Sequence, residues 1–159
     1  MDVRFGPRKD GEAGGLKYIC LVYHDEKKLG ALTQAEMDAL VGECIAWVED
    51  LNKTGQHVFS AGLQSPKTAT TVQVRNGKAS VTDGPFAETK EVLGGFTVLQ
   101  ARDLNEAISL AEKLPCSRIG RIEVRPVLDG EAEMTEPLDR KIATAIRRSN
   151  TGASTRRTP

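Results

Sequence analysis

The chain has 159 residues, 39% of them apolar and 28% charged, which suits one globular domain with a sizeable core. Its 22 basic and 22 acidic residues cancel, so direct nucleic-acid binding is not expected. No apolar run reaches the roughly 18 residues that span a bilayer, and the N-terminus lacks the apolar core of a signal peptide. We therefore expect a cytoplasmic protein without a membrane partner.

Composition divides the chain into three parts. Residues 1–16 mix glycines, a proline and charges without an apolar period, which predicts a flexible leader. Residues 17–129 hold the periodic segments and form the predicted domain. In residues 130–159 we expect a helix starting near Pro137 and then a disordered basic tail. The apolar side of that helix would consist of Leu138, Ile142, Ala145 and Ile146.

The first half of the domain predicts a strand, a helix and a second strand. Residues 17–23 are apolar on both faces, which is typical of a central strand. Thr33 and Glu36 match a capping box, and the helix that follows has a stripe of apolar residues and stops at Gly55. The stripe consists of Met37, Leu40, Val41, Cys44, Trp47, Val48 and Leu51. Residues 57–61 read as the second strand.

The second half predicts a hairpin, a strand, a helix and a last strand. Residues 71–75 and 78–82 flank Asn76-Gly77, the preferred pair for a two-residue type I′ turn. Residues 95–101 form another strand, and Asp103 begins a helix that Pro115 ends. The apolar stripe expected for this helix is Leu104, Ala107, Ile108, Ala111 and Leu114, and residues 121–125 alternate as a half-buried last strand.

This order predicts an α+β domain of the ferredoxin-like βαββαβ type with an added hairpin strand. Right-handed crossovers place both long helices on one face of the sheet. The first strand is apolar on both faces, so its second face also needs a cover. The simplest cover is the sheet of another subunit, which predicts a homodimer.

The loop from Asp83 to Glu91 combines turn residues, an aromatic residue and several charges. Turn building alone explains Asp83-Gly84-Pro85, with Phe86 plugging the core. A functional interpretation makes Lys90 an anion-binding cation and a nearby carboxylate a general base. A third interpretation is a salt bridge across the dimer. The candidate ligand-binding residues are Phe86, Glu88, Lys90 and Glu91.

The end of the first strand provides the other candidates. His24 and Asp25 lie where sheets often carry functional groups, and they join Asp83 as candidate catalytic residues. The alternative is a solvated strand end. The three cysteines are far apart in sequence and form no Cys-x-x-Cys pair, which predicts reduced thiols. Cys44 is expected to be an inert core thiol without cationic neighbours.

Residues 17–127 resemble the DGPF-domain branch of the YCII-related family. The resemblance lies in the opening Lys17-Tyr18 strand, the hairpin region, the nine-residue signature from Asp83 to Glu91 with Leu93-Gly94-Gly95-Phe96, and the closing Glu123-Val124-Arg125-Pro126. It implies a dimeric α+β barrel and an active-site His and Asp, and a few relatives act as dehalogenases of small lactones. The helix from Thr33 to Asn52 contains no histidine, so His24 and His57 are the candidates.

Two function classes remain. The first is an enzyme or binding protein that accepts a small molecule near the Asp83 to Glu91 loop. The second is a non-catalytic regulatory partner of an extracytoplasmic-function sigma factor, which the family resemblance implies. No phosphate loop, metal-ligand cluster or Ser-His-Asp spacing is present, so no cofactor and no metal are predicted.

Overall fold

A computed structural model describes residues 15–128 and 137–152. Most of the predicted leader and tail therefore lies outside the described residues. The main sheet is antiparallel, with four strands in the order β2-β5-β1-β6 and the expected strand in its centre. These strands are β1 Leu16–His24, β2 His57–Gly62, β5 Val92–Ala101 and β6 Gly120–Pro126.

The chain connects the strands as two interleaved βαβ units. Strand β5 lies between β1 and β2, and β1 lies between β5 and β6, so each helical connection skips over one strand. This arrangement is compatible with the predicted ferredoxin-like α+β fold. The helices are α1 Glu26–Gly30, α2 Gln34–Lys53, α3 Leu104–Ala111 and α4 Pro137–Gly152, with short 3-10 turns η1 Pro66–Thr68 and η2 Pro115–Arg118.

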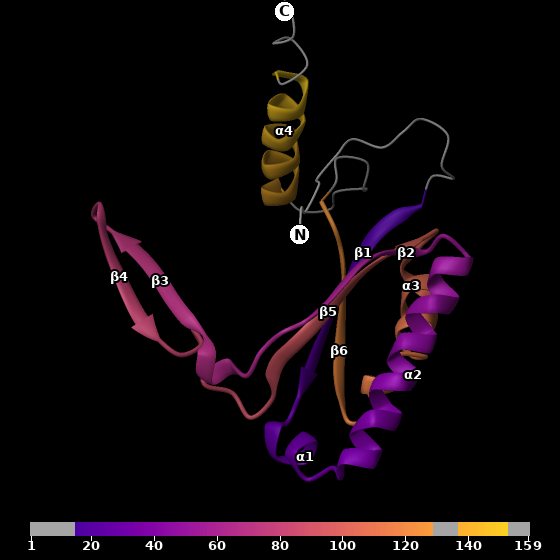
Figure 1. Ribbon diagram of the computed structural model, residues 1–159. Coiled ribbons are helices and arrows are strands. Elements are labelled where there is room, and N and C mark those ends of the chain that lie inside the picture. Colours follow the sequence, from indigo (N-terminus) through magenta and orange to yellow (C-terminus); the bar gives the residue numbers. More distant parts are fainter. Residues whose placement is uncertain (1–14, 129–136, 153–159) are drawn as a thin grey trace, which may run out of the picture.

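Helices α2 and α3 lie on the same side of the sheet (Figure 1), as right-handed crossovers predict. The core forms between them and the sheet. Its buried residues are Tyr18, Cys20, Trp47, Leu51, Leu99, Ala101, Ala107, Ala111 and Leu114. The expected stripes were too broad, since Val41, Leu104 and Ile108 are exposed. Small alanines at the contact side of α3 let that helix approach the sheet closely.

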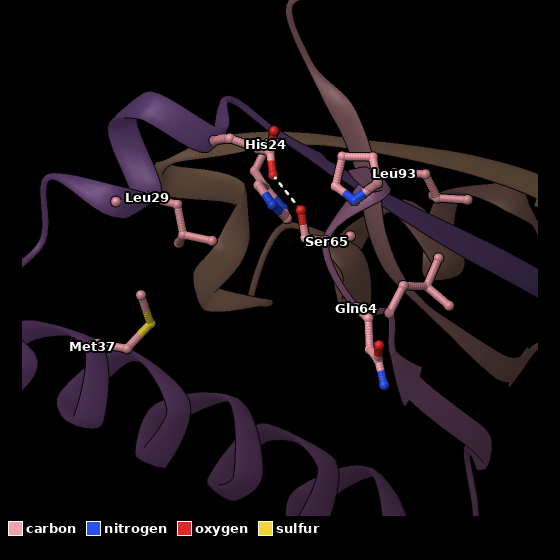
Figure 2. Close-up of a pocket in the computed structure, with 11 residues that line it drawn as sticks. His24, Leu29, Met37, Gln64, Ser65 and Leu93 are labelled. Carbon is pink, nitrogen blue, oxygen red and sulfur yellow. Dashed lines mark hydrogen bonds between the residues drawn. The ribbon is translucent and has the colours of Figure 1, made fainter. Parts of the chain in front are cut away.

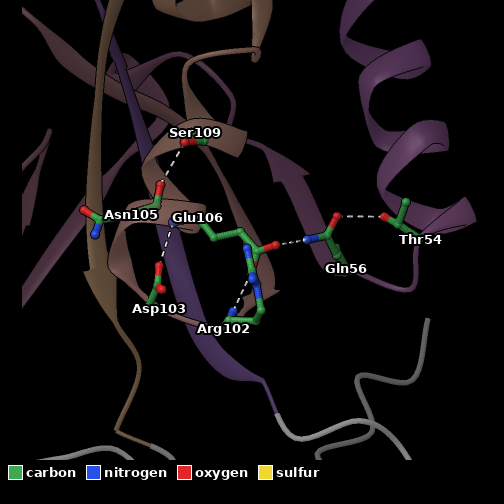
Figure 3. Close-up of polar contacts among 7 residues, drawn as sticks. All are labelled: Thr54, Gln56, Arg102, Asp103, Asn105, Glu106 and Ser109. Carbon is green, nitrogen blue, oxygen red and sulfur yellow. Dashed lines mark hydrogen bonds and ion pairs between the residues drawn. The ribbon is translucent and has the colours of Figure 1, made fainter.

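Side-chain caps fix the starts of both long helices. Thr33 and Glu36 form the predicted capping box of α2. Asp103 accepts a hydrogen bond from the Glu106 backbone at 2.9 Å, and Glu106 accepts one from the Arg102 backbone at 2.7 Å (Figure 3). Gln56, just after α2, donates to Glu106 at 3.4 Å and so connects the two helices at one end of the sheet.

The predicted hairpin forms from β3 Thr70–Arg75 and β4 Lys78–Asp83. Asn76 and Gly77 have φ values of 51° and 74°, as a type I′ turn requires. The hairpin does not extend the main sheet, because β3 and β4 form a separate two-stranded sheet. It projects away from the body of the molecule (Figure 1). The expected added strand is thus a protruding arm.

The sheet face opposite α2 and α3 is apolar at its centre. Ile19, Leu21 and Tyr23 of β1 lie beside Val98 and Phe96 of β5 on this face and are half-buried. Residues of the opposite parity in both strands, such as Tyr18 and Leu99, are buried under the helices. The first strand is therefore apolar on both faces, as the sequence predicts, but the described residues cover one of these faces only in part.

Helix α4 forms where the sequence predicts it. Among residues 137–146 Ala143 is buried, whereas Leu138 and Ile142 on the expected apolar side are exposed. None of the described helices is long and apolar enough to cross a membrane.

Candidate functional site

The end of β1 opens into a cavity of about 400 Å³ on the helix side of the sheet. Its walls come from β1, α1, α2, the β2-β3 connection and β5, five parts of the chain that the fold brings together. The lining residues are His24, Glu26, Leu29, Gly30, Met37, Leu63, Gln64, Ser65, Pro66, Leu93 and Gly94. Figure 2 shows Leu29 and Met37 on one side of the His24 ring, and Gln64, Ser65 and Leu93 on the other.

Gly94 makes the room in which the His24 ring lies. A Cβ atom at this position would be 1.9 Å from His24 Cε1 and 2.3 Å from its Nδ1, far inside van der Waals contact. Gly94 is also an extra residue in β5, because Val22 pairs with Gly95 and Tyr23 pairs with Leu93. Such β-bulges often occur beside functional sites, where they redirect side chains. The glycine is therefore required for space at the imidazole.

The outer wall of the cavity is fastened to this bulge. The Leu63 backbone donates a hydrogen bond to the Gly94 carbonyl at 2.8 Å. Two residues further on, the Ser65 hydroxyl donates to the Glu26 carboxylate at 3.1 Å, which connects the β2-β3 segment to α1 (Figure 2). One backbone hydrogen bond and one side-chain hydrogen bond therefore hold the β2-β3 segment against β5 and α1.

Asp25 is a structural residue of this wall. Its carboxylate accepts a hydrogen bond from the Lys27 backbone at 2.9 Å and caps the start of α1. The residue is only 8% exposed. Asp25 thereby fixes where α1, with Glu26 and Leu29, lies against His24.

The lining combines an apolar body with a few polar groups, as ligand sites commonly do. Leu29, Met37, Leu63 and Leu93 supply apolar surface, and His24 supplies a group that can donate, accept or transfer a proton. Lysine and arginine are not among the described residues that line it. The lining carboxylate, Glu26, accepts a hydrogen bond from Ser65, so this chemistry suits an organic molecule that is largely apolar and carries no negative charge.

A second cavity of about 380 Å³ lies next to the first. Asp25, Glu26, Lys27, Thr89, Lys90 and Val92 line it. Glu26 borders both cavities. The fold therefore brings Lys90, from the loop between Asp83 and Glu91, close to Asp25. Both residues were predicted from the sequence as candidates for the site.

The other candidate residues of the loop from Asp83 to Glu91 do not line either cavity. Asp83 pairs with Thr70 at the base of the hairpin, and Glu88 is exposed. Glu91 binds Arg121 on β6 at 2.5 Å. Phe86 is 89% exposed, so the expectation that it plugs the core is wrong. Gly84, two residues before this ring, has a φ of 96° and lies in the bend that follows β4.

His57, the second candidate histidine, lies on the edge strand β2. Its ring contacts Asn52 Oδ1 at 3.0 Å and Ser60 Oγ at 2.8 Å, and burial lowers its pKa. The described part of the chain contains no cluster of three or more His, Cys, Asp or Glu side chains arranged for a metal ion.

Sequence reasoning missed the residues that surround His24. Leu29, Met37, Gln64 and Ser65 carry no recognisable motif, and they meet only through the tertiary fold. One signal was available in the pair Gly94-Gly95, because glycines inside a strand often mark a bulge or a close approach.

Comparison with known proteins agrees with the resemblance to the YCII-related family. Over 112 residues the chain is 33% identical to "Uncharacterized protein R00369" of Rhizobium meliloti (strain 1021), an alignment that covers 69% of this chain and 90% of that protein. The family model described as the YCII-related domain matches residues 16–131. This match includes the whole main sheet and the cavity beside His24, and the chain belongs to the YCII-related family.

Proposed function

We propose that the protein binds a small, largely apolar organic molecule in the cavity beside His24. The observation that carries this proposal is the close approach of the His24 ring to Gly94. Because Gly94 has no side chain to cover the ring, the imidazole lines the cavity. The cavity volume of about 400 Å³ lies within the range of small-molecule sites. The motif Asp83-Gly84-Pro85-Phe86 further favours the DGPF-domain branch of the family.

His24 is the residue best placed to act on the bound molecule. A neutral imidazole can take a proton from a ligand carbon or oxygen and return it, and Glu26 and Ser65 offer further polar contacts at the same rim. Asp25 positions α1 and is not itself part of the cavity lining. The proposed role of His24 is therefore general base or hydrogen-bond partner, with Asp25 as a positioning residue.

A fragment screen tests the binding proposal without knowledge of the natural ligand. The probe is a library of neutral organic fragments, followed by NMR of the Met37 methyl group and the His24 ring protons. These two groups lie on different elements but line one cavity, so a true ligand shifts both. Fragments that shift neither group, while binding elsewhere, would contradict the proposal.

Two glycine variants give a matched comparison. Gly94→Ala inserts a methyl group against the His24 ring, whereas Gly42→Ala on α2 inserts one where nothing lies within 4 Å. We expect fragment binding to be lost in the first variant and retained in the second. Retained binding in both would show that the fragments do not use the His24 cavity.

We also propose that two copies associate through their sheets. Support comes from the half-covered apolar face formed by Ile19, Leu21, Tyr23, Phe96 and Val98. Light scattering at micromolar concentration should give twice the chain mass, and Leu21→Arg should give monomers. A wild-type chain that is monomeric at these concentrations would contradict this arrangement.

A regulatory role is the second candidate function, and the hairpin favours it. Val72, Val74 and Val81 lie on one face of the arm and are 63%, 65% and 65% exposed. Such an apolar face suits a protein partner, for which an extracytoplasmic-function sigma factor is the candidate. Purified sigma factor should co-elute with the wild-type protein and not with a Val72→Ser, Val81→Ser double variant. Equal co-elution, or none with either, would contradict this role.

A further inference from the structure

The fold brings two cysteines together that are 72 residues apart in the sequence. Cys44 on α2 and Cys116 on η2 have their sulfur atoms 3.5 Å apart. Both side chains are half-buried and pack against the edge of the core. The third cysteine, Cys20, is fully buried under α2 and α3.

A second contact holds the same two segments together. Glu43, the neighbour of Cys44, binds Arg118 at 2.5 Å, two residues after Cys116. Cys44 does pack against the core, as expected, but the expectation that it has no cationic neighbour is wrong. The guanidinium of Arg118 lies close enough to influence its charge, and the thiol is only half-buried.

The contact makes the two thiols chemically unequal. The hydrogen bond between the two sulfur atoms lowers the pKa of Cys44 to about 7, and Arg118 adds to this effect against the opposing effects of burial and Glu43. The same hydrogen bond, together with burial, raises the pKa of Cys116. Cys44 is thus the thiol of the pair that ionises more readily. Burial raises the pKa of Cys20 to about 11, so this third thiol is an internal control.

We propose that Cys44 and Cys116 are a reversible thiol-disulfide pair that reacts with oxidants of the peroxide class. An S–S bond is about 2.05 Å long, so closure needs an approach of about 1.5 Å from the 3.5 Å contact. The flanking Glu43 and Arg118 already hold the two segments side by side. This modification site is separate from the His24 cavity and independent of the proposed ligand.

The reaction takes place in two balanced steps. The Cys44 thiolate attacks one oxygen of hydrogen peroxide, the O–O bond breaks, and the departing hydroxide takes a proton to become water. Cys116 then loses its proton and attacks the sulfur of the Cys44 sulfenic acid, and the S–O bond breaks with release of a second water. Two thiols lose two electrons in total, and one peroxide becomes two waters. A thiol reductant reverses the reaction through a mixed disulfide.

The disulfide would join parts of the chain that both reach the end of β1. Helix α2 carries Met37 into the His24 cavity. The turn η2 leads directly into Gly120, which pairs with His24 in the sheet. Oxidation would therefore cross-link α2, which lines the cavity, to the turn that leads into the strand paired with His24, and raise the melting temperature by about 5 °C or more.

Intact mass and peptide mapping of the full chain test the proposal. After one equivalent of hydrogen peroxide, we expect the wild-type chain to lose the mass of two hydrogen atoms and to give one cross-linked peptide pair, Cys44 with Cys116. Dithiothreitol should restore both thiols. Cys20→Ser should behave in the same way, because Cys20 lies outside the pair.

Single variants of the pair separate the two steps. Cys116→Ser should stop at a sulfenic acid on residue 44, which dimedone traps, and Cys44→Ser should give neither product. The proposal is overturned if wild-type Cys44 and Cys116 stay reduced under these conditions, if each chain bonds to another chain, or if Cys20 enters the disulfide. The wild-type measurement decides the matter even if a variant fails to fold.

Discussion

The two halves of the segment from Asp83 to Phe96 lie in very different surroundings. The first half contains the most specific motif of the chain, yet Pro85, Phe86 and Glu88 are exposed. The second half is strand β5, where Gly94 and Gly95 form the bulge beside His24. The specific motif therefore shapes a turn between the hairpin and the sheet, while Gly94 in the second half provides the space beside His24.

The two halves require glycine for different reasons, one for its backbone conformation and the other for its lack of a side chain. Gly84 adopts a φ of 96° in open space, so its conformation requires glycine. A Cβ atom at Gly94 would collide with the His24 ring, so the space requires glycine there. Changes in the first half should therefore affect only the turn, whereas changes in the second half should affect the site.

The largest effect is expected for Gly94→Ala. The new methyl group must displace the His24 ring, and overpacking of this kind costs about 1–3 kcal/mol of unfolding free energy. Urea unfolding measures this cost, and the matched Gly42→Ala should instead stabilise α2 by roughly 0.5–1 kcal/mol. Similar stability of both variants would mean that the His24 ring is not confined by Gly94.

Asp25→Ala should have the next largest effect. Loss of the N-terminal cap of α1 costs about 1 kcal/mol, measured by the same unfolding experiment. Asp25→Asn retains an acceptor for the Lys27 backbone and should be close to wild type. If Asp25→Asn abolished ligand binding while Asp25→Ala left stability unchanged, the negative charge of Asp25 would be functional, and the capping role would be wrong.

A smaller effect is expected at the boundary between the two halves. Glu91 and Arg121 form an ion pair in which the Arg121 side chain is mostly exposed, so Glu91→Gln should cost about 0.2–1 kcal/mol. A double-mutant cycle with Arg121→Gln measures the coupling directly. A coupling well above this range would indicate that a second subunit buries the pair.

The smallest effect is expected for Phe86→Ser. The ring is 89% exposed in the single chain, so the substitution should change stability by no more than about 0.5 kcal/mol. Thermal unfolding at two protein concentrations provides the measurement. A large, concentration-dependent loss would show that Phe86 is buried between subunits, and the contrast between the two halves would then need revision.

Much of the fold could be predicted because local signals agreed with the tertiary arrangement. The capping box at Thr33, the Asn76-Gly77 turn and the doubly apolar first strand each determined one element. The short helix α1 was missed, because five residues are too few for an apolar period. Phe86 was misjudged, because hydrophobicity alone does not tell which way a loop residue points.

The site could be predicted only in part for a related reason. His24 stands out as a polar residue at the end of an apolar strand, and it does line the cavity. The contact between His24 and Gly94 depends on the register between β1 and β5, which cannot be predicted from either strand alone. The contact between Cys44 and Cys116 likewise depends on how α2 and η2 pack, so it could not be predicted from their positions in the sequence, although all three thiols are free as expected.

The central claim is that Gly94 keeps a ligand cavity open beside His24, and the most direct test is a thermal-shift titration with the best neutral fragment from the NMR screen. The account predicts a dose-dependent rise in melting temperature for the wild-type chain and for Gly42→Ala, and no rise for Gly94→Ala. An equal rise in all three proteins would contradict it, because the fragment would then bind without the space that Gly94 provides.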